Sequence, residues 1–225
     1  MVRMSFLPVK YQFDGKGGYN WLRMTQSQFF FIANLLCLDF VNTEPILRGE
    51  RVDLLGSLED LLSWLDAAEV LPPEAARRAK RWTRSAEGDA VFRQAIRLRQ
   101  TLRDAAERLA SGKPVSRETV KIVNQILASR PVYPQLTQQG KRFSTHLVPV
   151  GDAPLHLLVP VAESAAWLLE HGERSLVRRC ENPECVLVFY DTTKNKKRRW
   201  CSMDGCGSRA KAMAYYRRQR ESGGR

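Results

Sequence analysis

Four cysteines near the carboxyl end constrain this chain more than any other feature of its sequence. Cys180 and Cys185 form one C-x4-C pair, Cys201 and Cys206 form a second, and fifteen residues separate the two pairs. Thiolates are soft ligands that bind Zn²⁺ in a closed tetrahedron, and two loops that each supply two sulfurs fill all four positions. Because such a site leaves no position for water, we expect one structural Zn²⁺ here.

The local sequence favours a loop at each cysteine pair. Asn182-Pro183 and Asp204-Gly205 are turn-forming dipeptides. Residues 186–190 are typical of a strand, and residues 207–219 of a helix. A segment with so few apolar side chains needs a metal in order to fold. The alternatives are two disulfides, an iron–sulfur cluster or four unrelated thiols, and the lack of a secretion signal disfavours disulfides.

The charge of the chain is concentrated in the same region. Among 36 Lys and Arg and 24 Asp and Glu, residues 174–225 hold 14 of the basic and 5 of the acidic side chains. A basic module on a nearly balanced body is typical of polyanion-binding proteins, because neutralised phosphates release counterions. A solvated, solubilising face is the alternative. The cations expected to contact nucleic acid are Lys194, Lys196, Lys197, Arg198, Arg199, Arg209, Lys211, Arg217, Arg218 and Arg220.

The rest of the sequence gives no sign of a membrane protein. No run of 18 or more uncharged apolar residues occurs, and residues 1–20 lack the pattern of a signal peptide. We therefore expect a cytoplasmic protein without a membrane-embedded segment.

Hydrophobic periodicity predicts a mainly helical N-terminal domain. Residues 29–32 favour a short strand, residues 33–43 favour a buried helix, and Ser57 is expected to cap another helix. Residues 143–150 and 155–159 favour the two strands of a hairpin. Further helices are expected at residues 74–85, 90–109, 119–130 and 161–171. The predicted fold class is α+β, a mainly helical N-terminal domain with a small β-hairpin followed by a C-terminal zinc-finger module with four cysteine ligands.

Asp39, Asn42 and Thr43 lie at i, i+3 and i+4, so a helix presents them as one polar patch on an apolar element. Such a patch binds a small ligand or hydrogen-bonds to the domain's own backbone, and we favour the structural role. The nearby Cys37 is expected to be a small buried side chain. His146 and His156 lie on opposite strands of the expected hairpin, but no third ligand or nucleophile accompanies them, so we interpret them as ordinary strand histidines. We find no catalytic constellation and expect no enzyme, because an active site would have to assemble from distant residues.

Two segments resemble known families. The sequences RRWCSM at residues 198–203 and CGSRAK at residues 206–211 resemble the CGNR zinc finger, a C-terminal module of bacterial transcription regulators. The sequence LCLDFVNT at residues 36–43 is similar to the signature of the ABATE domain, which usually precedes that finger. The resemblance implies a regulatory or sensing role for the first domain. Ser208 stands where the name of the finger places Asn, and Ser is also a helix-capping residue.

These observations predict three segments: an N-terminal arm at residues 1–28, an ABATE-like domain at residues 29–173 and a CGNR-like finger with a basic helix at residues 174–225. The predicted function is DNA-binding transcription regulation, with the first domain as a sensor of a small-molecule effector or as a platform for homodimers. An RNA-binding or protein-interaction adaptor with a purely structural zinc is the first alternative. An enzyme with an unrecognised site in the first domain is the second.

Overall fold

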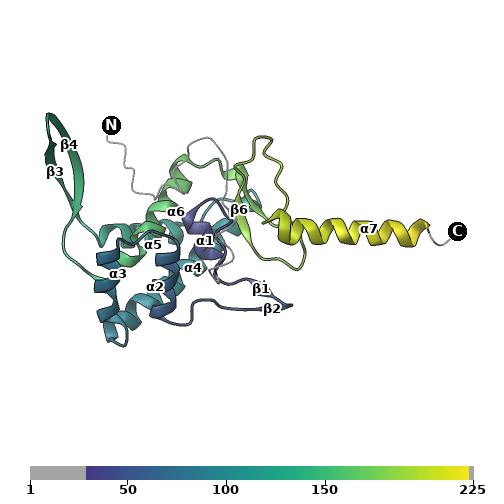
Figure 1. Ribbon diagram of the computed structural model, residues 1–225, viewed down its shortest axis with the longest axis horizontal. Helices are drawn as coiled ribbons and strands as arrows, with labels where there is room; N and C mark the ends of the chain where they lie inside the picture. Colours follow the sequence, from purple (N-terminus) through teal and green to yellow (C-terminus); the bar gives the residue numbers. More distant parts are fainter. Residues whose placement is uncertain (1–28, 223–225) are drawn as a thin grey trace.

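The computed structural model of this chain describes residues 29–222, so the arm expected at residues 1–28 lies outside the described residues. Figure 1 shows a helical body with one element extending from each of its two ends. One is the hairpin of β3 (Val132–Gln139) and β4 (Arg142–Pro149), and the other is helix α7 (Ser208–Ser222). No helix in the described part is long and apolar enough to cross a bilayer.

The remaining elements form the body between these two extensions. Its helices and helical turns are α1 (Leu36–Val41), α2 (Leu58–Ala67), α3 (Pro73–Ala79), η3 (Lys80–Trp82), α4 (Ala86–Ala110), α5 (Arg117–Ala128), η4 (Pro154–Leu158), α6 (Val159–His171), η5 (Arg174–Leu176) and η6 (Met203–Gly207). Its strands are β1 (Ile46–Leu47), β2 (Glu50–Arg51), β5 (Val177–Arg179) and β6 (Val188–Tyr190). In the described residues each sheet is an antiparallel pair, β1 with β2, β3 with β4 and β5 with β6. The predicted α+β class, mainly helical at the N-terminal side, is confirmed.

Serine residues mark the start of three helices. The side-chain oxygens of Ser57, Ser85 and Ser116 each accept a hydrogen bond from a backbone N–H three residues later, at the starts of α2, α4 and α5. The cap predicted at Ser57 is therefore confirmed. At the start of α4 a Cβ on Gly88 would lie 2.0 Å from the carbonyl oxygen of Trp82, so only glycine fits this close approach.

The core is built around α1. All six residues of this helix are buried, and α1 contacts α4, α6 and β6. The ring of Phe40 lies 5.1 Å from that of Trp64 on α2, measured between centroids. A helix of six residues is not stable alone, so burial on every side stabilises α1. The buried helix expected at residues 33–43 is present, over a shorter range.

The polar side chains of α1 and its end bind the backbone around them. The Asp39 carboxylate accepts hydrogen bonds from the N–H groups of Ile32 and Ala33, each at 2.8 Å. The Thr43 hydroxyl donates to the carbonyl of Phe40 at 2.8 Å. Asn42 donates to the carbonyl of Val188 at 2.9 Å and accepts from its N–H at 3.0 Å, so one amide side chain joins α1 to β6. These contacts give the patch the structural role that buried polar groups require.

Two ion pairs attach both ends of the β1–β2 hairpin to α4. Arg99, only 3% exposed, donates to both carboxylate oxygens of Asp53 at 2.6 and 2.5 Å. Arg103 binds Glu44 at 3.1 Å on the other side of the hairpin. Burial raises the pKa of Asp53, but the hydrogen bonds from Arg99 and from the N–H of Leu55 outweigh it, so the pKa of Asp53 is lowered.

Two sequence expectations were wrong. Residues 29–32 form no strand, because the N–H of Ile32 binds Asp39 instead of a neighbouring strand. The partner of β4 is β3 and not residues 155–159, because Pro154 begins η4, which leads into α6. Gly140, with φ of 61°, allows the two-residue turn between β3 and β4. His146 consequently lies opposite Gln135.

Replacing Asn42 by Ala should destabilise the protein strongly. The change leaves the buried N–H and carbonyl of Val188 without partners, which costs about 3 kcal/mol in free energy of unfolding. Urea denaturation measures this loss. Asn124→Ala, at an exposed position on α5, is the matched control and should change stability by less than about 0.5 kcal/mol. Equal effects of the two substitutions would contradict the stabilising role of the Asn42 hydrogen bonds between α1 and β6.

Replacing Asp53 by Asn should cost about 2 kcal/mol at pH 7, because it leaves the buried Arg99 guanidinium without its counter-ion while Asp53 itself is partly solvated. The pKa of Asp53 is lowered on folding, so its contribution is present above the unfolded pKa, about 3.9, and is lost as pH falls below that value. Denaturation curves of both proteins at pH 7 and pH 3 should therefore converge in acid. A difference that stays constant with pH would refute the ion pair.

Candidate metal centre and nucleic-acid interface

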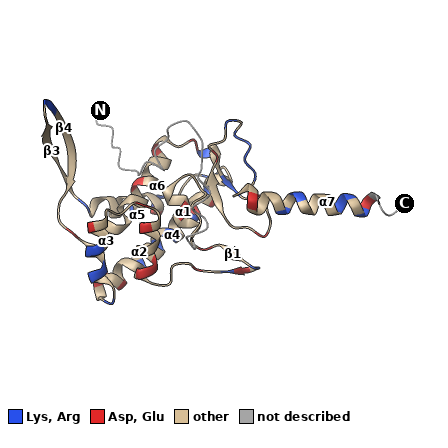
Figure 2. Cartoon of the chain, in the orientation of Figure 1, with Lys and Arg blue, Asp and Glu red and all other residues tan. Residues whose placement is uncertain are grey.

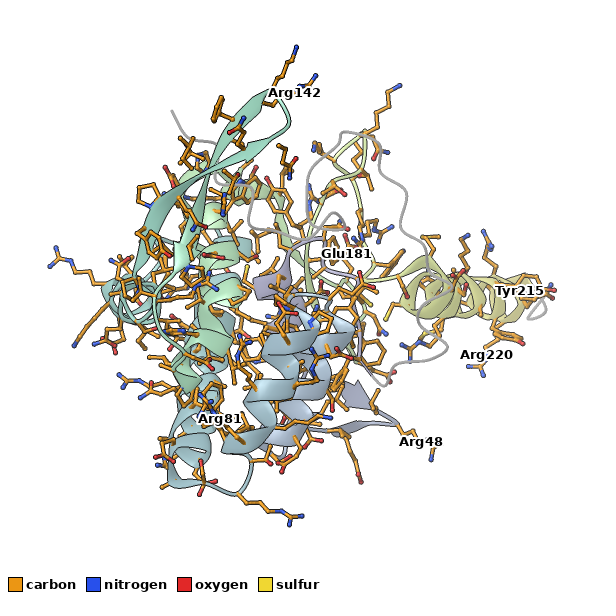
Figure 3. The ribbon with its side chains drawn as sticks, turned by 60° about the vertical axis from the view of Figure 1, so that its left-hand side comes forward. Arg48, Arg81, Arg142, Glu181, Tyr215 and Arg220 are labelled. Atoms are coloured by element: carbon orange, nitrogen blue, oxygen red, sulfur yellow. The ribbon has the colours of Figure 1, made fainter. Side chains whose placement is uncertain are left out.

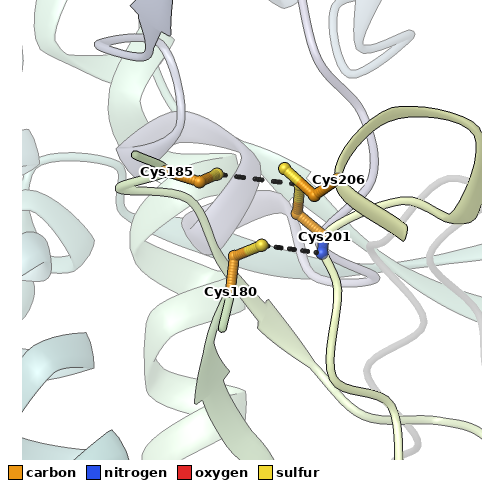
Figure 4. A group of neighbouring side chains, drawn as sticks. All are labelled: Cys180, Cys185, Cys201 and Cys206. Carbon is orange, nitrogen blue, oxygen red and sulfur yellow. Dashed lines mark hydrogen bonds between the residues drawn. The ribbon is translucent and has the colours of Figure 1, made fainter. Parts of the chain in front are cut away.

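The chain brings its four C-terminal cysteines to one point. Cys180 follows β5, Cys185 lies shortly before β6, Cys201 precedes η6 and Cys206 lies within it. Figure 4 shows the four side chains converging from these segments. Their sulfur atoms all lie within 4.8 Å of one another, and none forms a disulfide. The predicted site is therefore assembled from all four residues.

The sulfur spacing fits one tetrahedral Zn²⁺. Zinc–sulfur bonds of about 2.3 Å place tetrahedral sulfurs about 3.8 Å apart. The Sγ atoms of Cys185 and Cys201 are 3.8 Å apart, and those of Cys201 and Cys206 are 3.6 Å apart. A zinc site with four cysteine ligands has no open position, so its chemistry is a cross-link that holds two loops together. The four cysteines hold one structural Zn²⁺.

The thiols affect one another's acidity in opposite directions. Hydrogen bonds from Cys185 and Cys201 lower the pKa of Cys180, so one thiolate forms readily. The pKa values of Cys185 and Cys201 are raised, first because these groups are hydrogen-bonded to Cys180 and also because burial disfavours charge. Four thiolates this close together need positive charge, which a divalent cation supplies.

Hydrogen-bond donors surround the sulfur atoms. The side-chain amide of Asn182 and the guanidinium of Arg209 each donate to the Sγ of Cys206 at 3.3 Å. The N–H of Cys201 donates to the Sγ of Cys180 at 3.4 Å. A zinc ion with four thiolates carries net negative charge, and donors of this kind offset it. Arg209, predicted as a nucleic-acid contact, thus also supports the metal centre.

Backbone and side-chain hydrogen bonds attach the metal-binding segment, residues 177–206, to the helical body. The N–H of Tyr190 donates to the carbonyl of Ala33 at 2.8 Å, and the Asn34 side chain donates to the carbonyl of Tyr190 at 2.7 Å. The Arg198 guanidinium donates to the carbonyls of Ile32 and Cys201 and lies 4.1 Å above the Phe189 ring. These contacts, together with the two hydrogen bonds between Asn42 and the backbone of Val188, make β6 part of the core.

The other expected nucleic-acid contacts divide between a loop and a helix. In the loop, Lys194, Lys196 and Lys197 are exposed, and Arg199 is exposed while pairing with Glu181 at 2.6 Å. On α7, Lys211, Arg217, Arg218 and Arg220 are exposed, as is Arg209 beside the metal centre. Figure 2 shows cationic segments in both places. Arg198 differs from the rest, because the carbonyls described above engage its guanidinium.

Helix α7 stands on the metal centre. It contacts η6 and otherwise extends away from the body (Figure 1). The side chains of Met213, Tyr215 and Tyr216 are 73%, 52% and 65% exposed, so α7 has no buried face beyond its first turns. Ser208 donates from its hydroxyl to the carbonyl of Met203 at 3.0 Å, whereas Ser202 caps η6 by accepting from Gly205. Ser208 therefore fixes the junction of η6 and α7 as a donor, unlike the cap expected from the sequence.

Sequence reasoning missed two residues of this site. Asn182 looked like part of a turn, and its donation to a sulfur has no sequence signal beyond the Asn-Pro dipeptide. Arg198 was one cation in a basic run, and only the fold separates its buried contacts from those of its exposed neighbours. Neither is a cysteine ligand, and both contact the metal-binding segment through hydrogen bonds.

Comparison with known families gives two matches. Residues 34–172 match ABATE, described as "Putative stress-induced transcription regulator". Residues 177–219 match the CGNR zinc finger. Both agree with the resemblance of the sequence motifs, and neither description names a catalytic activity. Among curated proteins no match is found.

Elemental analysis should find one zinc per chain, and Cys201→Ser should remove it. A strong chelator should produce the same loss and open residues 177–219 to proteases, because metal binding and folding are coupled in such modules. Cys37→Ala is the control: burial raises the pKa of Cys37 to about 12, and this thiol lies in the core. That variant should keep one zinc. Retention of zinc by Cys201→Ser, or its loss from Cys37→Ala, would contradict the assigned ligands.

Proposed function

The chain belongs to the ABATE family, and from this premise we propose that its zinc finger binds duplex DNA in the cytoplasm and that its N-terminal domain regulates this binding. The finger comprises the metal centre, the loop at residues 191–200 and α7. Zinc has a structural role in this proposal, and the surface that it organises makes the contact.

One observation carries the proposal: α7 is a cationic helix that extends into solvent from a rigid metal centre. The major groove of a duplex is wide enough to admit a helix. Lys211, Arg217, Arg218 and Arg220 are exposed along α7. A helix of 15 residues with so little packing is marginally stable in water, and a polyanionic partner would stabilise it.

The loop at residues 191–200 supplies a second cationic segment. Asp191 is fully buried, and its carboxylate accepts hydrogen bonds from the N–H groups of Thr193 and Arg198 at 3.0 and 2.9 Å. These bonds shape the loop from within. Lys194, Lys196 and Lys197 then remain at its surface, where phosphate contacts would fix the register of the protein on the duplex.

Regulation by the N-terminal domain would pass through α1. This helix contacts β6 directly, and Asn42 is hydrogen-bonded to both backbone groups of Val188. A small-molecule effector or a second copy of the chain that shifts α1 would therefore shift the metal-binding segment. In this proposal the N-terminal domain is a sensor or an oligomerisation platform, and its state changes how the finger binds DNA.

RNA or single-stranded nucleic acid is the second candidate partner. Tyr215 and Tyr216 expose their rings on α7, and bases stack on exposed aromatic side chains. Competition between duplex DNA, RNA of the same sequence and single strands separates the two candidates. Preference for a single strand, together with loss of binding in Tyr216→Ala, would favour this second partner.

Duplex binding by the zinc-loaded protein should depend steeply on salt. If about six cations contact phosphates, log K against log salt concentration should have a slope of about −5. Replacing Lys194, Lys196 and Lys197 by Ala should make the slope less negative by about 2.7. Fluorescence anisotropy with a labelled duplex measures both slopes.

A charge-matched control separates a specific surface from overall charge. Arg77, Lys80 and Lys121 are exposed on the helical body, and replacing these three by Ala removes the same charge. This variant should keep the slope of the unchanged protein to within about one. No retention of duplex by the zinc-loaded protein at low salt would reject the proposed function.

A further inference from the structure

We propose that the turn between β1 and β2 is a second contact point for the DNA backbone, with Arg48 as the contacting side chain. This inference rests on the proposed binding of duplex DNA by the finger and extends it to a segment of the N-terminal domain. The partner group is a phosphate that flanks the part of the duplex bound by α7.

The backbone of this turn is unfavourable for the residue it holds. Leu47 pairs with Glu50, so Arg48 and Gly49 are the two central residues of the turn. Their φ angles are 54° and 87°, and positive values at both central positions are typical of a type I′ turn. Asn-Gly suits such a turn, whereas a long side chain in the left-handed region is disfavoured. Arginine is therefore a poor choice for the turn itself.

No contact of the Arg48 side chain within the described residues explains why arginine occupies this turn position. Its side chain is exposed, and among residues 29–222 it has no hydrogen bond or ion pair. Arg51, by contrast, pairs with Glu44 at 3.6 Å. An unpartnered cation at a strained position is free to contact a group outside the chain, and the place of the turn in the fold decides which group it meets.

The turn is held in a fixed position on the side of the molecule from which α7 extends. The ion pairs of Arg99 with Asp53 and of Arg103 with Glu44 attach the two ends of the β1–β2 hairpin to α4. In Figure 1 the turn points in the same direction as α7, and Figure 3 shows Arg48 and Arg220 on one side of the body. Arg81, in the same view, lies on the other side. In this proposal a duplex bound along α7 passes the β1–β2 turn, which lies on the same side of the body.

The finger loop repeats this combination of charge and conformation. Lys196 is exposed and has a φ of 52°, so it too is a cation in the left-handed region. Arg48 belongs to the N-terminal domain and Lys196 to the finger. Both segments, like the base of α7, are attached to the core of the helical body. Together with α7 they would bind phosphates at separate positions, which suits the length of a duplex better than a single small anion.

Arg48→Asn is the informative variant because it removes the charge and relaxes the turn. Its thermal midpoint should equal or exceed that of the unchanged protein, so weaker binding cannot be attributed to unfolding. Affinity for a duplex at low salt should fall about fivefold, and the salt slope should become less negative by about one.

Arg84→Asn is the matched control. Arg84 is also an exposed arginine with positive φ, 64°, and it lies three residues after Arg81 in the sequence. This variant should bind the duplex as the unchanged protein does. Glu50→Gln, which removes a negative charge from the same turn, should strengthen binding about threefold.

The outcomes distinguish this inference from the function on which it rests. If the unchanged protein binds duplex and Arg48→Asn binds equally well, the contact at the turn is overturned while the proposed function stands. Equal weakening by Arg48→Asn and Arg84→Asn would show a net-charge effect and overturn the contact as well. If the unchanged protein binds no duplex, the proposed function fails and this inference fails with it.

Discussion

The burial of β6 against α1 is the constraint on which the arrangement of this protein depends. Val188 and Phe189 are almost fully buried, and Asn42 binds the N–H and the carbonyl of Val188 from α1. The metal-binding segment thus passes through the core of the helical body between its two cysteine pairs. A finger on a flexible linker would be weakly coupled to its neighbouring domain, whereas β6 of this finger packs against α1 of that domain.

The electrostatics of the chain follow from the same arrangement. The segment from residue 174 onward carries 14 basic and 5 acidic side chains, but some of these cations, exposed or not, are already hydrogen-bonded within the protein. Arg198 binds backbone carbonyls, and Arg209 donates to the sulfur of Cys206. The cations without such a bond to the metal-binding segment lie on the loop and farther along α7. A count of charges therefore overstates the surface available to a polyanion, and the fold decides which charges remain.

The sequence predicted the metal centre better than the fold around it. Soft ligands at matched spacing leave few alternatives, so the four cysteines could be assigned without coordinates. Helix α2 was also predictable, because Ser57 and an apolar stripe mark its start. Strand β3 was not, because Pro134 and its glutamines do not resemble a strand, and the two-residue turn at Gly140 depends on a local φ. Long-range pairing of this kind is decided by tertiary contacts rather than by local pattern.

The polar residues of α1 show why a motif can be recognised before its role is understood. In sequence, Asp39, Asn42 and Thr43 form a patch that suits a ligand as well as the backbone. The structure gives Asp39 and Thr43 partners within the N-terminal domain, but the partner of Asn42 lies in the finger. An isolated N-terminal domain would lose this partner and would expose to water the part of α1 that β6 covers. The motif therefore makes physical sense only when the zinc-binding segment is part of the same folded unit.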